Sequence, residues 1–180
     1  MKNVVVVEYD PEWPEVFERL RATIWSAVSD VALTIEHVGS TAVPGLAAKP
    51  VIDLDVVVPD DAVPVAIARL ARIGYRHRGD LGIPGREAFR HDLAIPHHVY
   101  VCPRSSAALG NHLAVRDHLR TDDEAAAAYG ALKRRLAEQF PHDMDGYVAG
   151  KTHFLVDLLR SLGFQPDALD AIERMNRRPS

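Results

Sequence analysis

The sequence predicts an α/β fold in residues 1–104, followed by a helical region in residues 105–180. Two observations support this division. Short β-branched runs alternate with amphipathic stretches in the first part, and beyond Pro103 only helical periodicity remains. With 47% apolar residues, the 180-residue chain suits one α/β core with a C-terminal helical bundle packed on it.

The first predicted elements are a short strand and a long helix. The run 4–9, VVVVEY, is β-branched and predicts a strand. Asp10 as N-cap and Pro11 at the first helical position predict the start of a helix that extends to Asp30. Apolar residues recur along it at helical spacing, which gives the helix one face for the core.

Three more strands, a helix and a hairpin complete the first part. The predicted strands are 31–38, 51–58 and 97–103. A loop with room for one helical turn joins the first two strands. A helix over 60–74 is closed by Gly74, and 75–92 predicts a hairpin that turns around Leu81–Gly85.

The second part contains helices only. Their predicted ranges are 107–120, 123–140, 143–163 and a short 166–175, followed by a loose tail.

The composition limits the partners and the compartment. The net charge of −4 gives no electrostatic footprint for a long nucleic acid, although a locally basic site for a small anion remains compatible with it. Cys102 is the only cysteine, which excludes an intrachain disulfide and fits a reducing compartment. No apolar run approaches the roughly 20 residues of a membrane span. We expect a cytoplasmic protein without a membrane partner.

Two aspartates interrupt the apolar strand 51–58. Asp53 and Asp55 are two residues apart and therefore point to the same face of the strand. Two such carboxylates call for a cation between them, and Mg²⁺ prefers oxygen ligands. The alternative is an edge strand with a solvated acidic face. The nearly continuous apolar flanks favour a central strand and a metal-binding pair.

The turn before this strand offers a phosphate site. Gly39 lets the backbone approach a ligand closely, and the turn amides together with the Ser40 hydroxyl suit phosphate oxygens. A strand, Gly-Ser, a short loop and a strand with Asp-x-Asp place phosphate-binding groups beside a metal-binding pair. This combination serves attack on a nucleoside triphosphate whose phosphates carry Mg²⁺.

The chain resembles the GrpB family within the nucleotidyltransferase superfamily, whose members also occur fused to dephospho-CoA kinases. The resemblance rests on HVGSTAVPGLAAKPVIDLDV, HHVYV, RDHLR, YGALK and YVAGK, which begin at residues 37, 97, 116, 129 and 147. It implies a nucleotidyltransferase-like mixed sheet with flanking helices. Lys49 belongs to the first motif, and the resemblance favours its reaching a phosphate over the alternative, in which it only solvates the loop.

The pattern departs from that superfamily at the third carboxylate, which active members usually carry on a neighbouring strand. Here that strand is expected to be HHVYV, which presents His98 and Tyr100 instead of an acid. Three explanations remain open: a single metal, a different ion, or proton transfer by His98. A partly buried structural histidine is the alternative reading of His98.

Two lysines lie within apolar helical stripes. Lys133 follows Tyr129 by four residues, and Lys151 follows Tyr147 by four, so each pair shares a helix face. A buried unpaired ammonium is costly, and snorkelling is the alternative explanation. Two such pairs in adjacent helices favour a shared polyphosphate target. Arg116 is a further candidate ligand, although an ion pair with Asp117 explains it as well.

These residues lead to one prediction for the site. Gly39 and Ser40, with Lys49, Lys133 and Lys151, would hold a nucleoside triphosphate. Asp53 and Asp55 would hold the metal, and a nucleotidyl group would pass to a small-molecule acceptor. A non-catalytic nucleotide- or metabolite-binding module, or a metal-dependent phosphohydrolase using His98, are the rival hypotheses. The sequence carries no signal for an oligomeric state. The histidines other than His37 and His98 are expected to be surface or structural residues.

Overall fold

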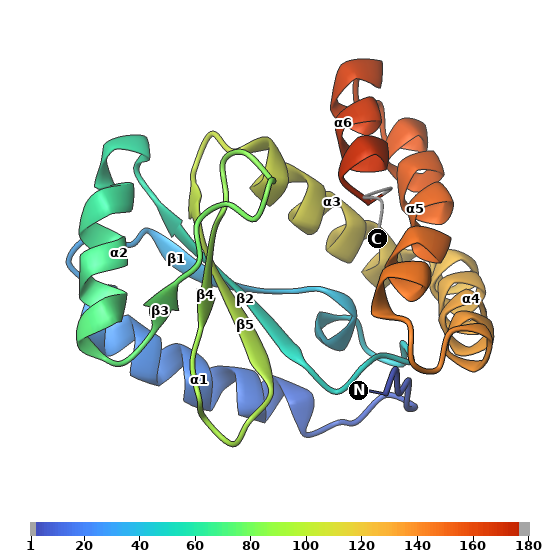
Figure 1. Ribbon diagram of the computed structural model, residues 1–180, viewed down its shortest axis with the longest axis horizontal. Coiled ribbons are helices and arrows are strands. Elements are labelled where there is room, and N and C mark those ends of the chain that lie inside the picture. Colours follow the sequence, from blue (N-terminus) through green and yellow to red (C-terminus); the bar gives the residue numbers. More distant parts are fainter. Residues whose placement is uncertain (1–2, 177–180) are drawn as a thin grey trace.

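A five-stranded mixed sheet lies at the centre of the computed structural model, which describes residues 3–176 (Figure 1). The strand order is β1-β2-β5-β4-β3. β2 and β5 run parallel, and the other neighbours are antiparallel. The strands are β1 Thr34–Val38, β2 Ile52–Val58, β3 Arg76–His77, β4 Glu87–Arg90 and β5 His97–Pro103. The predicted mixed sheet with flanking helices is confirmed.

The main core lies on one face of this sheet. Ile52, Leu54, Val56 and Val58 of β2 are buried against α1 (Trp13–Val28) and α2 (Val63–Arg72). Alternation along β2 therefore sends the intervening residues to the opposite face.

That opposite face carries both aspartates. At its far end, Val57 of β2 and Cys102 of β5 pack under Leu109 of α3 (Ala107–Thr121). Asp53 and Asp55 come before Val57 on the same strand, outside this apolar contact. The carboxylates thus lie on the face of the sheet that packs against α3.

Three more helices complete the helical part. They are α4 Asp123–Gln139, α5 Met144–Ser161 and α6 Pro166–Asn176, close to the predicted ranges. Ser106, Asp122 and Asp143 cap α3, α4 and α5 by accepting hydrogen bonds from backbone amides of the first turn. Most of the predicted tail, residues 177–180, lies outside the described residues.

Two predictions for the N-terminus were wrong. The run 4–9 forms no ladder, because it lies against the β1–β2 loop and the α4–α5 turn rather than beside a strand. Val7 makes a single bridge to Ala48, and the Val4 amide donates to the Pro141 carbonyl. Asp10 is not the N-cap of α1. Its carboxylate accepts from the Glu12 amide in an extra turn before the helix.

Among residues 3–176, no helix combines the length and the apolar character needed to cross a bilayer.

Candidate functional site

An imidazole holds each carboxylate of β2. His98 Nδ1 lies 2.8 Å from Asp53 Oδ1, and His112 Nδ1 of α3 lies 2.7 Å from Asp55 Oδ2. Asp55 is completely buried, and its Oδ1 has no hydrogen-bond partner among the described residues. A buried acceptor of this kind is costly unless a ligand satisfies it.

The position of the third carboxylate is occupied as the sequence indicated. In the parallel β2–β5 register, His98 stands beside Asp53 and Tyr100 beside Asp55. In residues 3–176 no group of three or more His, Cys, Asp or Glu side chains could hold a metal ion. The Arg86 guanidinium lies 4.2 Å from the centre of the Tyr100 ring, and burial raises the Tyr100 pKa.

The Gly-Ser turn approaches Asp53 closely. Gly39 has φ +73°, and a Cβ on it would lie 2.3 Å from Asp53 Oδ2. A side chain there is excluded both by the backbone conformation and by space. Ser40 begins a short 3-10 helix, Ser40–Ala42, which is the predicted helical turn, and it interacts with the Tyr129 hydroxyl.

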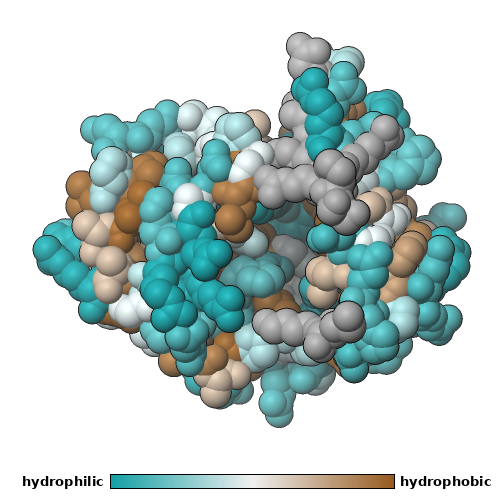
Figure 2. All heavy atoms as spheres, in the orientation of Figure 1, coloured by the Kyte–Doolittle hydropathy of each residue, from teal (hydrophilic) through white to brown (hydrophobic). Residues whose placement is uncertain are grey.

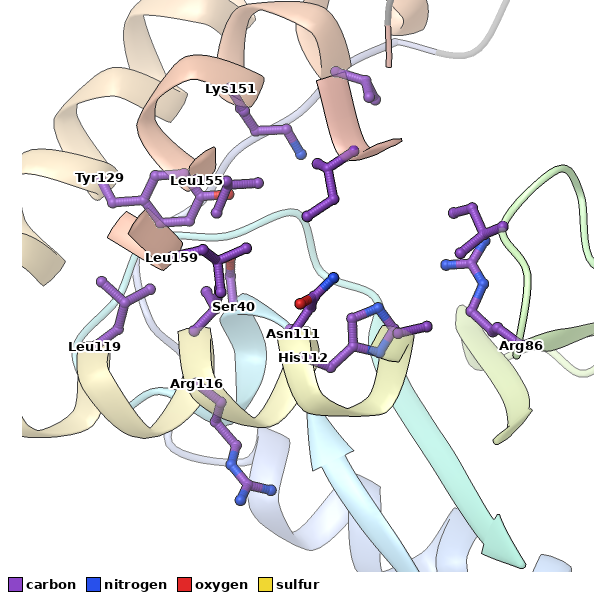
Figure 3. Close-up of a pocket in the computed structure, with 16 residues that line it drawn as sticks. Ser40, Arg86, Asn111, His112, Arg116, Leu119, Tyr129, Lys151, Leu155 and Leu159 are labelled. Carbon is purple, nitrogen blue, oxygen red and sulfur yellow. The ribbon is translucent and has the colours of Figure 1, made fainter. Parts of the chain in front are cut away.

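Two arginines of α3 hold this turn from outside. Arg116 Nη1 donates to Glu36 at 2.8 Å and to the His37 carbonyl at 3.1 Å, and Arg120 donates to the Ala42 carbonyl. The Arg116 guanidinium points away from the cavity (Figure 3). These contacts position the turn, and Arg116 also belongs to the lining of the cavity, so its expected role as a substrate ligand stays a prediction. His37 contributes from within, through a 3.0 Å hydrogen bond to Thr41.

Lys133 is buried without a counter-charge. It is 2% exposed, its Nζ has no hydrogen-bond partner in the described part of the chain, and it lies 4.5 Å from the centre of the Tyr129 ring. Burial, with smaller contributions from Lys151 and Arg134, lowers its pKa to about 7. The tyrosine face replaces only part of the lost hydration.

Lys151 repeats this arrangement on α5. Its Nζ lies 4.6 Å from the centre of the Tyr147 ring. Burial and the nearby Lys49 lower its pKa to about 8, although Asp53 acts in the opposite direction. Lys49 contacts the same ring from 5.8 Å. Lys151 therefore lies close to Lys49 and to Asp53, and Lys133 lies close to Lys151.

A cavity of about 300 Å³ opens between the sheet and the helices. In Figure 3, Lys151 extends from α5 toward the side on which Asn111 and His112 of α3 lie. α3, α5 and α6 supply most of its apolar walls, and its other lining residues are Gly39, Ser40, Arg86, Asn111, His112, Arg116, Tyr129 and Lys151. The apolar lining comprises Ile83, Ala108, Val115, Leu119, Val148, Leu155, Leu159 and Ile172.

Three residues of this region escaped the sequence prediction. His112 was expected to be a surface or structural residue but binds Asp55, and its only signal was its place one turn before Arg116 on α3. Arg86 lies in the hairpin and has no local signal at all. The Asn111 Oδ1, beside His112, is buried without a partner in the described residues.

Comparison with known proteins identifies the family. The family model described as "GrpB protein" matches residues 3–161. The chain belongs to the GrpB family. It is 31% identical over 156 residues to the UPF0157 protein YqkA of Bacillus subtilis, covering 86% of this chain but only 46% of YqkA. It is 35% identical to a UPF0157 protein of Streptomyces coelicolor, covering 87% and 82% of the two chains.

A dephospho-CoA kinase relative and two solved structures also agree with the resemblance that the sequence motifs indicated. A dephospho-CoA kinase of Mycolicibacterium paratuberculosis is 32% identical over 87% of this GrpB chain and 45% of the kinase. The crystal structure of GrpB from Enterococcus faecalis superposes with TM-score 0.78 and 34% identity, over 92% of this chain and 98% of that one. Terminal uridylyl transferase 4 from Trypanosoma brucei with bound UTP has TM-score 0.50 and 17% identity, covering 96% and 57%. The last match shows the nucleotidyltransferase fold alone.

Proposed function

We propose that this GrpB protein transfers a nucleotidyl group from a nucleoside triphosphate to a small-molecule acceptor. The observation that carries the proposal is Lys133, an ammonium group that is buried near Lys151 without a counter-charge in the described residues. Such an arrangement is costly in the free protein, and a bound polyphosphate would relieve it. The likeness in fold to a uridylyl transferase with bound UTP supports the same chemistry.

The triphosphate would lie in the part of the cavity lined by Gly39, Ser40 and Lys151. Backbone amides at Gly39 and Ser40 would donate to its oxygens, and Lys133 and Lys151, with Lys49 nearby, would neutralise its charge. The apolar walls from α3, α5 and α6 would take the nucleoside. In this proposal residues 1–104 supply the two carboxylates, and residues 105–180 supply Lys133 and Lys151.

Asp53 and Asp55 would hold Mg²⁺. The fit rests on the buried Asp55 Oδ1 and on the histidines that orient the two carboxylates from outside, as outer partners of metal ligands do. Two carboxylates suffice when phosphate oxygens and water complete the shell, which is common for Mg²⁺. When bound, the ion would supply Lewis-acid stabilisation of charge on the phosphates.

The remaining groups would act on the acceptor. An acceptor oxygen forms a bond to the α-phosphorus while the bond from that phosphorus to the bridging oxygen breaks, and pyrophosphate leaves with the electron pair. Asp53 accepts the Nδ1 proton of His98, so the Nε2 of His98 is the atom available to take the acceptor proton. A cytoplasmic location is part of the proposal, because triphosphates and the free thiol of Cys102 both fit a reducing compartment.

A second candidate is a nucleotide- or metabolite-binding module without catalysis. It is favoured by the His98 side chain, which stands on β5 where an active enzyme of this superfamily would usually carry an acid. Such a module would keep the lysines and the Gly-Ser turn and bind triphosphate without consuming it.

One experiment separates the two. The protein is incubated with ATP, CTP, GTP or UTP labelled at the α-phosphate, with and without Mg²⁺, in the presence of a deproteinised metabolite extract. Transfer predicts a new labelled product and equimolar pyrophosphate, both lost in Asp53→Asn/Asp55→Asn. Triphosphate binding without any labelled product would support the binding module, and absence of both would refute the proposed function.

A further inference from the structure

Another cavity, of about 590 Å³, opens over β4 and β5 and has His98 in its lining. We call it the β4–β5 groove. Its charged and imidazole side chains are Arg78, Arg90, His91, Asp92, His97 and His98. Figure 2 shows strongly hydrophilic side chains gathered over this part of the sheet. Apart from Tyr100, beside Asp55, and His98, beside Asp53, none of the residues placed at the nucleotide site lines the groove.

The strand register puts the groove on the carboxylate face of the sheet. His98 stands beside Asp53 in the β2–β5 pairing, and Ala88 of β4 stands beside Tyr100 of β5. Arg90 follows Ala88 by two residues and shares its face. The Arg78 amide donates to the Ala88 carbonyl, so Arg78 lies at the same level of the sheet. A molecule that lies along this face would reach from the two arginines to His98.

The positively charged side chains of the groove are not neutralised by acidic side chains in its lining. Asp92 is the only acid in its lining, and it forms a 2.7 Å ion pair with Arg76, outside the groove. Arg90 lies near enough to Asp92 to contribute to its lowered pKa, after the larger effects of Arg76. Neither Arg78 nor Arg90 has a side-chain hydrogen bond or an ion pair in residues 3–176. The His91 Nδ1 is buried there without a partner.

We propose that the β4–β5 groove binds the acceptor of the transfer reaction, and that the acceptor carries a phosphate group held by Arg78 and Arg90. This inference rests on the proposed function. Guanidinium groups match the oxygens of a phosphate, and two of them suit its double charge better than the single charge of a carboxylate. The reacting end of the acceptor would lie toward His98, beside Asp53, with the triphosphate on the far side of that aspartate. The bounded groove and the net charge of −4 favour a small phosphorylated molecule over a long nucleic acid.

The test measures binding of inorganic phosphate by calorimetry in a background that lacks the two buried lysines, Lys133→Met/Lys151→Met. Saturable binding is expected in this protein. Adding Arg78→Gln/Arg90→Gln should weaken it about tenfold or more, the scale of charge-assisted hydrogen bonds. Arg72→Gln/Arg135→Gln is the matched control, because it removes two exposed arginines elsewhere and should leave the affinity within about twofold.

Three results would overturn the groove assignment. They are no saturable phosphate binding in the lysine-free background, equal loss in the control variant, or acetate binding as strong as phosphate binding. The readout is independent of catalysis. In the otherwise unaltered protein, Arg78→Gln/Arg90→Gln should keep triphosphate affinity within about twofold of the wild type. If instead triphosphate binds nowhere, the proposed function fails while phosphate binding in the groove remains measurable.

Discussion

Binding of a nucleoside triphosphate should take up protons from the solvent at pH 8. Desolvation lowers the pKa of Lys133 to about 7 and that of Lys151 to about 8, compared with 10.5 for an ordinary lysine. A polyphosphate placed beside them favours their charged forms and should return both pKa values well above 8.

The number of protons follows from these values. At pH 8 a group with pKa 7 is about one-tenth protonated and a group with pKa 8 is about half protonated. Complete protonation of both in the complex requires about 0.9 protons for Lys133 and about 0.5 for Lys151, or about 1.4 in total. The terminal phosphate does not interfere, because its last pKa lies near 6 and it is fully ionised at pH 8.

Calorimetry in buffers of different ionisation enthalpy measures this quantity directly. The observed binding enthalpy, plotted against the buffer ionisation enthalpy, has the number of protons taken up as its slope. Lys133→Met should reduce the slope by about 0.9, and Lys151→Met by about 0.5. A wild-type slope below about 0.3, or a slope that neither substitution changes, would refute the assignment of the lysines to the phosphates.

Three further predictions concern the turn, the metal and the stability. Gly39→Ala should destabilise the fold by about 3 kcal/mol, and the control Gly45→Ala, which has φ +76° and open space, by only about 1 kcal/mol; urea unfolding of both tests this. Asp53→Asn/Asp55→Asn keeps acceptors for both imidazoles, so calorimetry should find Mg²⁺ binding lost, while a melting temperature more than several degrees lower would make the aspartates structural. Burial lowers the pKa of His37 to about 4, so the unfolded chain binds a proton that the native chain refuses between about pH 6.5 and 4. The free energy of unfolding should therefore decrease by about 3 kcal/mol as the pH is lowered from about 6.5 to about 4, and His37→Gln should remove most of this decrease. A His37→Gln variant whose free energy of unfolding depends on pH as in the wild type would contradict this prediction.

The sequence alone was sufficient for most of the fold. Hydrophobic periodicity separates strands from helices locally, and capping residues precede three of the predicted helices, at Ser106, Asp122 and Asp143. The prediction of a strand at residues 4–9 was wrong because local β propensity does not show whether a partner strand lies beside it. The N-cap prediction for Asp10 was wrong because its carboxylate can accept a hydrogen bond either in the first turn of the helix or in a turn before it, and the sequence does not distinguish the two.

In the candidate site, too, the sequence predicted the contacts between residues close in the chain and not those between distant residues. Residues two apart on a strand share a face, which placed Asp53 and Asp55 together. Residues four apart on a helix are neighbours, which placed each lysine next to a tyrosine ring. Contacts across long separations had no such signal. His112 reaches Asp55 from 57 residues away, and Arg86 covers Tyr100 from the hairpin.

Tertiary structure also changed the meaning of residues that the sequence had singled out. Arg116, expected from the sequence to be a substrate ligand or to pair with Asp117, also donates to Glu36 and to the His37 carbonyl, contacts that the sequence did not indicate. The sequence thus determined which side chains share a face, since that depends on chain geometry over a few residues. Which charges are neutralised, and which remain available for a ligand, was decided only by packing, because a counter-charge comes from whichever distant segment the fold brings within 3 Å or so.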